Sequence, residues 1–347
     1  DGGEWDPVIK VLYKACGIDF SLYKQTTVER RIHRRMNFQH LEEVPAYAEY
    51  LLRNREEVDA LYRDLLIGVT EFYRDPEVFA YVEEKVIPEL LQRARGNEVR
   101  LWVAGCATGE EVYSLAISFE EAIRERGWEG KLSLFATDAH RHSLSMASAG
   151  LYPEDSLRHL GEERLERYFH LEQPGLYRIS PDLRRKIVFA PHNVITDPPF
   201  TRIDFISCRN LLIYLKGDIQ ERVLRFFHYA LNRQGVLLLG TSEGLARMEA
   251  GFKRLDARHK VFQKEGAKVH PPAGGRVPDL RGGGGNLSRL APAGEGRMAQ
   301  IEKDLLQSYD YILDRHVPPG VIINERNEVL HYFGSFSEYL VPESGRM

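Results

Sequence analysis

The chain has 347 residues, of which 43% are hydrophobic and 28% charged, and its formal net charge is -4. This length predicts two domains and a piece of a third, and the slightly acidic balance argues against a general nucleic-acid binder. Because no apolar run approaches the roughly 18 residues of a membrane span and no signal-peptide pattern opens the chain, we expect a cytoplasmic protein without membrane insertion.

Residues 5–95 carry helical periodicity almost throughout. In VPAYAEYLLRNREEVDALYRDLLIGV, residues 44–69, apolar side chains recur at steps of three and four residues. The pattern predicts an all-helical N-terminal domain over residues 5–95.

Residues 96–266 consist of short apolar runs, most of them separated by segments long enough for a helix. The runs are VRLWVAG (99–105), LSLFATD (132–138), KIVFAPH (186–192), IDFISC (203–208) and GVLLLGT (235–241). Such alternation predicts an α/β fold in which helices cover both faces of a parallel sheet.

Residues 267–297 are rich in glycine and proline, which predicts a linker without packed structure. Residues 298–347 predict a helix and then two strands around a polar turn, and the chain stops too soon to complete a domain. Since it also begins at Asp1 rather than Met, we expect a fragment of a longer protein.

The first apolar run ends in the turn GCATGEE, residues 105–111. Glycines there let the backbone approach a ligand at the carboxyl ends of the strands. The spacing matches neither GxGxxG nor the phosphate loop GxxxxGK(S/T), and Glu110 and Glu111 would repel a phosphate. We therefore expect a ligand with a cationic end, and S-adenosylmethionine carries a sulfonium and an ammonium group.

Asp138 ends the next predicted strand, where a carboxylate can accept hydrogen bonds from ribose hydroxyls. This position favours a nucleoside-containing ligand beside the turn. The alternative is that Gly105 and Gly109 serve only helix–strand packing and that the two glutamates are a favourable first helical turn.

Neither a disulfide framework nor a metal site is expected. The cysteines Cys16, Cys106 and Cys208 lie far apart without CxxC spacing. The histidines His33, His140 and His142 have no partner spacing that indicates a metal.

Five sequence blocks resemble, in order and separation, the chemotaxis receptor methyltransferases of the CheR family. They are TEFYRDPEVF (70–79), GCATGEEVYSLA (105–116), ATD (136–138), FAPHNV (189–194) and SCRNLLIYL (207–215). The resemblance implies a helical N-terminal domain and a class I, Rossmann-like methyltransferase domain with a small antiparallel strand insert. It also implies methyl transfer from S-adenosylmethionine to glutamate side chains of chemoreceptors, with S-adenosylhomocysteine as product. The tail resembles the opening of a PAS sensor domain.

The resemblance assigns much of the cofactor site. It implies that Glu111 lies near the methionine end, beyond the Gly105 turn, and that Asp138 accepts from the ribose. Asn193 and Val194 would lie against the adenine.

The remaining matched positions would surround the reacting groups. Thr70 and Arg74 match a block in which the linker helix closes over the cofactor, and Arg209 and Asn210 would line the pocket near the methyl group. Tyr214 matches the tyrosine that, with the arginine, is placed near the substrate carboxylate. Arg74 and Tyr214 are therefore the expected catalytic residues.

The chain departs from the family pattern at a few positions. Gly68 replaces an asparagine, and His140 stands where a second acid is common after Asp138. We expect these departures to affect cofactor affinity rather than identity.

The motif DPPF, residues 197–200, matches the signature of enzymes that methylate amino groups. In those enzymes it follows the fourth strand, whereas here it precedes that strand, IDFISC. We interpret it as a proline-rich loop that enters a strand.

The basic run TTVERRIHRRM, residues 26–36, has two interpretations. Its arginines, Arg30, Arg31, Arg34 and Arg35, could form a docking surface for the acidic helices of a receptor bundle, as the family implies. Alternatively, the helix is simply solvated and its side-chain stems pack on the domain.

The strand insert contains a short loop, HLEQPG, with one glycine. Family members that dock on a receptor's C-terminal pentapeptide tether carry a longer, glycine-containing loop here. We therefore expect a chemoreceptor partner that is bound without such a tether.

Two other function classes stay open. One is a methyltransferase with a different acceptor, for which Gly68 and the sensor-like tail are suggestive. The other is a non-catalytic module that binds S-adenosylmethionine or S-adenosylhomocysteine and signals through the tail. The presence of both Arg74 and Tyr214 favours catalysis.

Overall fold

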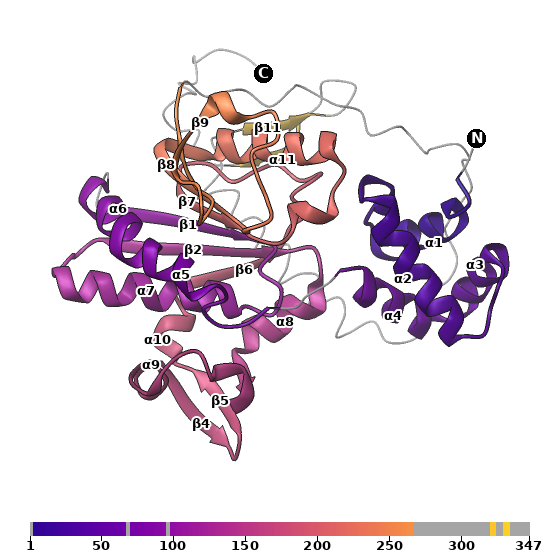
Figure 1. The fold of residues 1–347 in the computed structure, drawn as a ribbon, viewed down its shortest axis with the longest axis horizontal. Coiled ribbons are helices and arrows are strands. Elements are labelled where there is room, and N and C mark those ends of the chain that lie inside the picture. The colour runs from indigo at the N-terminus through magenta and orange to yellow at the C-terminus, as the bar shows by residue number, and fades with distance from the viewer. Residues whose placement is uncertain (1–2, 67–69, 95–97, 267–319, 324–328, 334–347) are drawn as a thin grey trace, which may run out of the picture. The chain divides into compact units, whose positions relative to one another are not determined.

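The computed structural model describes residues 3–66, 70–94 and 98–266, together with the backbone of residues 320–323 and 329–333. The chain divides into two compact units, residues 1–269 and 270–347. The first unit contains a helical part and a sheet flanked by helices (Figure 1). Of the helices in these ranges, none is both long enough and apolar enough for a membrane span.

Four helices form the N-terminal part. They are α1 (Asp6–Cys16), α2 (Gln25–Phe38), α3 (Val44–Arg53) and α4 (Arg55–Leu65). Leu12, Ile32 and Leu61, from three of these helices, are completely buried. The helical periodicity of this part is confirmed, because side chains spaced three and four residues apart face a common core.

A buried carboxylate joins three of these helices. Glu57 of α4 is 2% exposed and accepts hydrogen bonds from Arg35, from Gln39 just after α2, and from Tyr47 of α3. Burial acts to raise the pKa of Glu57, but the hydrogen bonds and the charge of Arg35 outweigh it and hold the pKa below its ordinary value. One arginine of the basic run is therefore engaged inside the domain.

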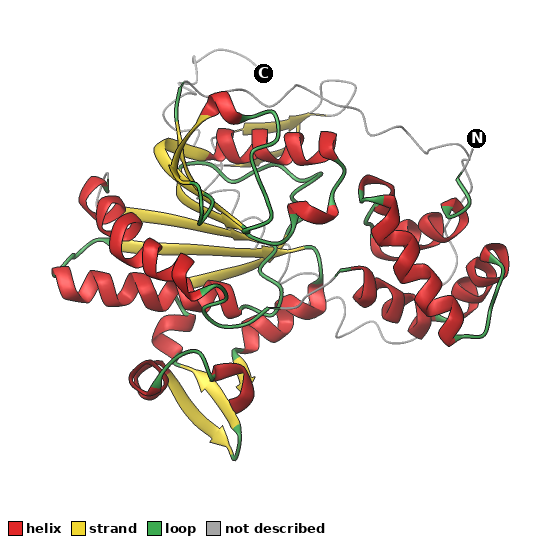
Figure 2. Cartoon of the chain, in the orientation of Figure 1, coloured by secondary structure: helices red, strands yellow, loops and turns green. Residues whose placement is uncertain are grey.

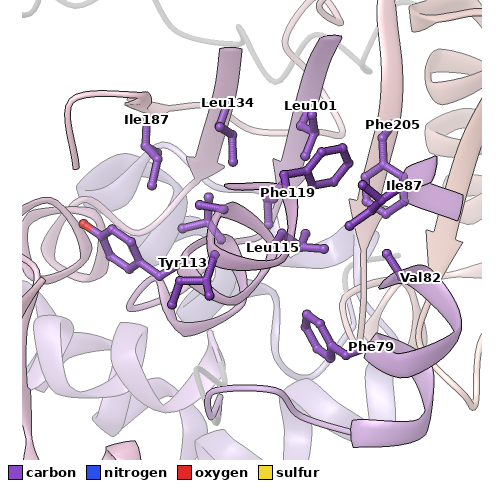
Figure 3. Close-up of a cluster of buried hydrophobic side chains, with 14 of the residues drawn as sticks. Phe79, Val82, Ile87, Leu101, Tyr113, Leu115, Phe119, Leu134, Ile187 and Phe205 are labelled. Atoms are coloured by element: carbon purple, nitrogen blue, oxygen red, sulfur yellow. The ribbon is translucent and has the colours of Figure 1, made fainter. Parts of the chain in front are cut away.

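Three helical segments follow: α5 (Pro76–Tyr81), a π-helical turn (Val82–Val86) and α6 (Ile87–Arg93). Phe79, Val82 and Ile87 from these segments share one buried cluster with Phe119 and Phe205 of the sheet region (Figure 3). These segments fall within the range assigned above to the helical domain and its linker helix, and their apolar side chains pack against the sheet.

The main sheet has seven strands in the order β6-β2-β1-β7-β8-β10-β9. They are β1 (Glu98–Ala104), β2 (Lys131–Asp138), β6 (Ile187–Pro191), β7 (Ile203–Cys208), β8 (Leu231–Leu239), β9 (Phe252–Asp256) and β10 (Val261–Lys264). The first five correspond to the predicted runs and pair in parallel. The predicted parallel sheet is confirmed for these five strands, and one edge adds two strands that were not predicted, where β10 pairs antiparallel with β8 and β9. The short turn between β9 and β10 permits a hairpin but no parallel crossover.

Helices cover both faces of this sheet (Figure 2). Helix α7 (Glu110–Arg126) packs on one face and α11 (Gly217–Ala230) on the other. Leu101 of β1 belongs to the cluster that contains the α7 side chains, whereas its neighbour Trp102 meets Phe227 of α11 edge to face, with ring centroids 5.3 Å apart. Successive side chains of β1 thus pack on opposite faces of the sheet, one against α7 and the next against α11.

The predicted strand insert is present between β2 and β6. Its strands are β3 (Leu151–Pro153), β4 (Phe169–Gln173) and β5 (Leu176–Ile179), which form an antiparallel sheet in the order β3-β5-β4. The helices α8 (Arg141–Ala149), α9 (Glu162–Tyr168) and α10 (Pro181–Arg184) flank these strands in the chain. A two-residue turn at 174–175 joins β4 to β5, so the loop is as short as expected.

The DPPF segment lies in the loop before β7, as expected. Phe200 stacks on Phe135 at 5.3 Å between centroids and meets Trp102 edge to face. Asp197 accepts a hydrogen bond from the backbone N–H of Asn193. These contacts favour the structural interpretation of the motif.

In the second unit, β11 (Gly320–Ile323) and β12 (Val329–Phe333) pair antiparallel, which confirms the two predicted strands. The predicted linker at 267–297 and the predicted helix beyond residue 298 lie outside the described residues. Gly68 also lies outside them.

Replacing Glu57 with alanine should destabilise the helical part by roughly 3 kcal/mol, because it leaves Arg35 without its buried anion. Thermal unfolding followed by circular dichroism should show a Tm several degrees lower. The matched control is Glu56→Ala, since Glu56 is exposed on the same helix. Equal Tm values for the two variants would contradict the role given to Glu57.

Candidate functional site at the carboxyl ends of the strands

One cavity of about 760 Å³, open to solvent, lies where β1, β2 and β7 end. Eight of the predicted site residues line it: Thr70, Arg74, Gly105, Glu111, Asp138, Arg209, Asn210 and Tyr214. Residues from four separate blocks of the sequence thus meet in one place.

Asn193 and Val194 are not among the residues that line this cavity. They lie in the loop after β6, where the Asn193 side-chain oxygen accepts a hydrogen bond from the N–H of Ile195. The loop begins beside the end of β2, since the N–H of His192 donates to the carbonyl of Asp138. An adenine contact for the two residues stays a prediction.

The glycine turn after β1 has two functions. Gly105 has a φ of 75° and lines the cavity, and its N–H donates to the carbonyl of Thr137 at the end of β2. Gly109 has a φ of 98°, and a Cβ there would lie 2.9 Å from both Ala147 Cβ and the Tyr152 hydroxyl. The packing interpretation therefore holds for Gly109, whereas Gly105 belongs to the cavity.

The two glutamates after this turn point to different surroundings. Glu110 is buried and accepts hydrogen bonds from the Thr108 hydroxyl, and burial raises its pKa. Glu111 lines the cavity and accepts from the Ser207 hydroxyl at 2.6 Å and from Arg209 at 3.2 Å. Only Glu111 can therefore present its charge to a ligand, and that charge is partly balanced by an arginine.

Arg209 connects the strand end to the segment before α5. Its side chain is fully buried and lies over the Phe79 ring, 5.6 Å from the centroid. It donates to Glu111, to Asp75 at 2.6 Å and to the carbonyl of Arg74 at 2.9 Å. The guanidinium is thus largely hydrogen-bonded to protein groups, and it connects the segments that form the site.

The backbone around Arg74 is held in an unfavourable conformation. Tyr73 and Asp75 have φ values of 52° and 61°, in the left-handed region that residues other than glycine seldom adopt. Each such residue costs on the order of 1–3 kcal/mol and persists only where its surroundings enforce it. The Tyr73 N–H donates to the Ser114 hydroxyl, and Arg209 binds the other side. Arg74 is therefore presented to the cavity by a rigid segment.

Asp138 is fixed by the backbone of two loops. Its carboxylate oxygens accept hydrogen bonds from the N–H of Ala107 at 2.9 Å and of His140 at 2.8 Å. Burial raises the pKa of Asp138, although these hydrogen bonds oppose the shift. Each oxygen accepts one of these bonds and keeps acceptor capacity for a ligand hydroxyl.

The helical part contributes a wall of the cavity. Tyr23 lines it, although only 7% of Tyr23 is exposed, and burial together with the charge of Asp138 raises its pKa. The backbone of Tyr23 bridges that of Leu215, and the Lys24 N–H donates to the carbonyl of Tyr214 at 2.8 Å. The segment that carries Tyr214 is thereby tied to the start of α2.

Asp75, Ser207 and Tyr23 were not predicted from the sequence. Asp75 and Ser207 stand within matched blocks, so their proximity to the predicted site residues was the available signal. Tyr23 lies in the extended connection between the short helical turn Phe20–Leu22 and α2, and it shares no spacing pattern with the strand ends. Its place in the cavity depends on tertiary packing alone.

Family models match most of the chain. The model for the CheR methyltransferase SAM binding domain matches residues 68–261, and that for the CheR methyltransferase all-alpha domain matches residues 3–66.

Three relatives show how far the similarity extends. An uncharacterized 104.1 kDa protein of Rhodobacter capsulatus is 38% identical over 340 residues, which are 97% of this chain but 35% of that protein. The putative methyltransferase Cher3 of Pseudomonas putida is 33% identical, with 74% of this chain and 95% of that protein covered. The chemotaxis protein methyltransferase of Escherichia coli is 30% identical, with 71% and 85% covered. With both family models matched in chain order, the chain belongs to the CheR methyltransferase family.

Proposed function

We propose that this chain transfers the methyl group of S-adenosylmethionine to glutamate side chains of chemoreceptor-type proteins and forms methyl esters. The observation that supports this most is the cavity, where Glu111 and Asp138 share one space with Arg74 and Tyr214. The residues proposed for the cofactor and those proposed for the acceptor carboxylate therefore line the same cavity.

The cavity residues fit S-adenosylmethionine. Asp138 keeps acceptor capacity for ribose hydroxyls, and Glu111 offers negative charge toward the cationic end. No phosphate-binding turn competes with this interpretation, because the GCATGEE segment places Glu111 in the lining. When bound, S-adenosylmethionine supplies an electrophilic methyl group on its sulfonium sulfur.

The protein has to orient the acceptor and need not deprotonate it. A glutamate side chain has a pKa of about 4.3 and is ionised at neutral pH. Arg74 can pair with the acceptor carboxylate, and Tyr214 can donate a hydrogen bond to it. Because the carboxylate loses charge as the ester forms, very strong binding of the ionised carboxylate would slow the reaction, and moderate binding favours it.

The exposed face of α2 supports docking on an acidic partner. Arg30, His33 and Arg34 lie together along a shallow groove. Arg35 points inward to Glu57 and does not contribute to this surface. We propose that this groove receives the helical bundle of a chemoreceptor, and that the cytoplasm is the location of this encounter.

Two finer assignments belong to the same proposal. The tight turn between β4 and β5 supports docking without a pentapeptide tether. The antiparallel pair β11 and β12 supports a PAS-like continuation of the chain. The domain ranges 5–95, 96–266, 267–297 and 298–347 are likewise proposed, although the packing of Phe79, Val82 and Ile87 favours a division near residue 67.

The proposal is tested by the transfer of labelled methyl from S-adenosylmethionine into receptor-containing membranes, followed by mild alkaline hydrolysis. Methyl esters release volatile methanol in base. Base-labile label in a receptor-sized band is expected. Base-stable label would indicate an amino-group acceptor, and absence of label from a chain that binds cofactor would indicate a sensor module.

Arg74→Ala and Tyr214→Phe should lower kcat by roughly 10- to 100-fold, since each removes a hydrogen bond to a charged group worth about 1.5–3 kcal/mol. Binding of S-adenosylhomocysteine, measured by calorimetry, should change much less. Arg74→Lys keeps the charge without the planar fork and should give an intermediate rate. Equal losses of binding and turnover in both variants would contradict their assignment to the acceptor.

Asp138→Ala should have the opposite signature. Binding of S-adenosylhomocysteine should weaken by roughly 10- to 100-fold, because the ribose loses a charged acceptor. Turnover at saturating cofactor should fall less. Unchanged affinity in a variant with a native circular dichroism spectrum would remove Asp138 from the site.

The double variant Arg30→Glu, Arg34→Glu should raise the KM for a receptor-type acceptor, and the effect should shrink with added salt. Cofactor affinity should stay unchanged. Arg93→Glu and Arg126→Glu, on α6 and α7, reverse the same number of charges elsewhere and serve as the control. If both pairs have the same effect, α2 is not the docking surface.

A further inference from the structure

A buried glutamate outside the cavity lining binds the segment that carries Asn210 and Tyr214. Glu243 follows β8 and is 6% exposed. One carboxylate oxygen accepts hydrogen bonds from the N–H of Gly240 at 2.7 Å and of Asn210 at 3.0 Å. The other accepts from the N–H of Ile213 at 3.2 Å.

These bonds join two loops at the carboxyl ends of β7 and β8. Asn210 has a φ of 60°, so the turn after β7 needs outside support. The loops approach so closely that a Cβ on Gly240 would lie 2.8 Å from the Asn210 nitrogen and 2.8 Å from the Glu243 carboxylate. Any residue larger than glycine at position 240 would therefore force the two loops apart.

The charge of Glu243 is balanced mainly by main-chain dipoles. Among the described residues, no arginine, lysine or histidine forms an ion pair with Glu243. Burial raises the pKa of Glu243, and hydrogen bonds from the backbone of residues 210, 212, 213 and 240 oppose this shift. A buried carboxylate that serves backbone donors fixes a loop conformation, because those N–H groups would otherwise lack acceptors.

We propose that Glu243 is a positioning residue of the transfer site. It holds the segment from Asn210 to Tyr214, so that the Tyr214 hydroxyl faces the acceptor and Asn210 lines the cavity. This inference rests on the proposed function. It means that the loop after β8 supports the site, although no residue of that loop lines the cavity.

The test compares Glu243→Gln with the wild-type chain in the methyl-transfer assay, well below the Tm of both. Glutamine keeps the volume and one acceptor oxygen but turns an NH₂ group toward backbone donors. We expect kcat to fall roughly 10- to 100-fold, as a displacement near 1 Å can cost that much. Binding of S-adenosylhomocysteine should change much less.

A double-mutant cycle identifies the route of the effect. If Glu243 acts through Tyr214, then Glu243→Gln should lower kcat little further in a Tyr214→Phe background. The control is Glu57→Gln, which removes another buried, multiply bonded carboxylate and should lower Tm without changing kcat.

Hydrogen exchange gives a readout independent of turnover. The amides of Asn210 and Ile213 should exchange faster in Glu243→Gln than in the wild-type chain. An inactive wild-type chain would contradict the proposed function, and the exchange rates would still test the loop. Unchanged kcat in an active chain, full additivity with Tyr214→Phe, or unchanged exchange would each overturn the role of Glu243.

Discussion

The site depends on one buried guanidinium. Arg209 is fully enclosed and binds Glu111 of α7, Asp75 and the carbonyl of Arg74, so it connects the end of β7 to two other elements. Without it, two carboxylates would be left close together at the ends of buried strands, and the unfavourable backbone on either side of Arg74 would lose a support. The resemblance placed Arg209 near the methyl group, and its contacts indicate that it organises the residues that would meet cofactor and acceptor.

A second constraint is that the cavity is built by both parts of the first unit. Tyr23 comes from the helical part, and the backbone of Lys24 binds the residue proposed to contact the acceptor, Tyr214. Helix α2 begins at the next residue, Gln25. The helix proposed for docking is therefore connected directly, through Lys24, to the segment that carries Tyr214. This arrangement gives a physical reason for the helical part to accompany the sheet.

Much of the fold and site could be predicted because the informative residues lie at strand ends. The apolar runs identified all five parallel strands, and a glycine turn and an acid at the ends of adjacent strands must meet at one edge. The antiparallel strands β9 and β10 were missed because they are short and partly charged. Glu243, Tyr23 and the inward turn of Arg35 were missed for a different reason, since each depends on contacts between distant segments that no local spacing encodes.

The most direct test is a crystal structure of the chain with S-adenosylhomocysteine. We expect the ligand in the cavity, with its ribose hydroxyls within hydrogen-bond distance of Asp138 and with Arg209 still bound to Asp75 and Glu111. Arg74 and Tyr214 should line the part of the cavity that an acceptor would enter. Ligand bound elsewhere, or Arg209 turned away from both carboxylates to hold the ligand, would show that Arg209 does not organise this site as proposed.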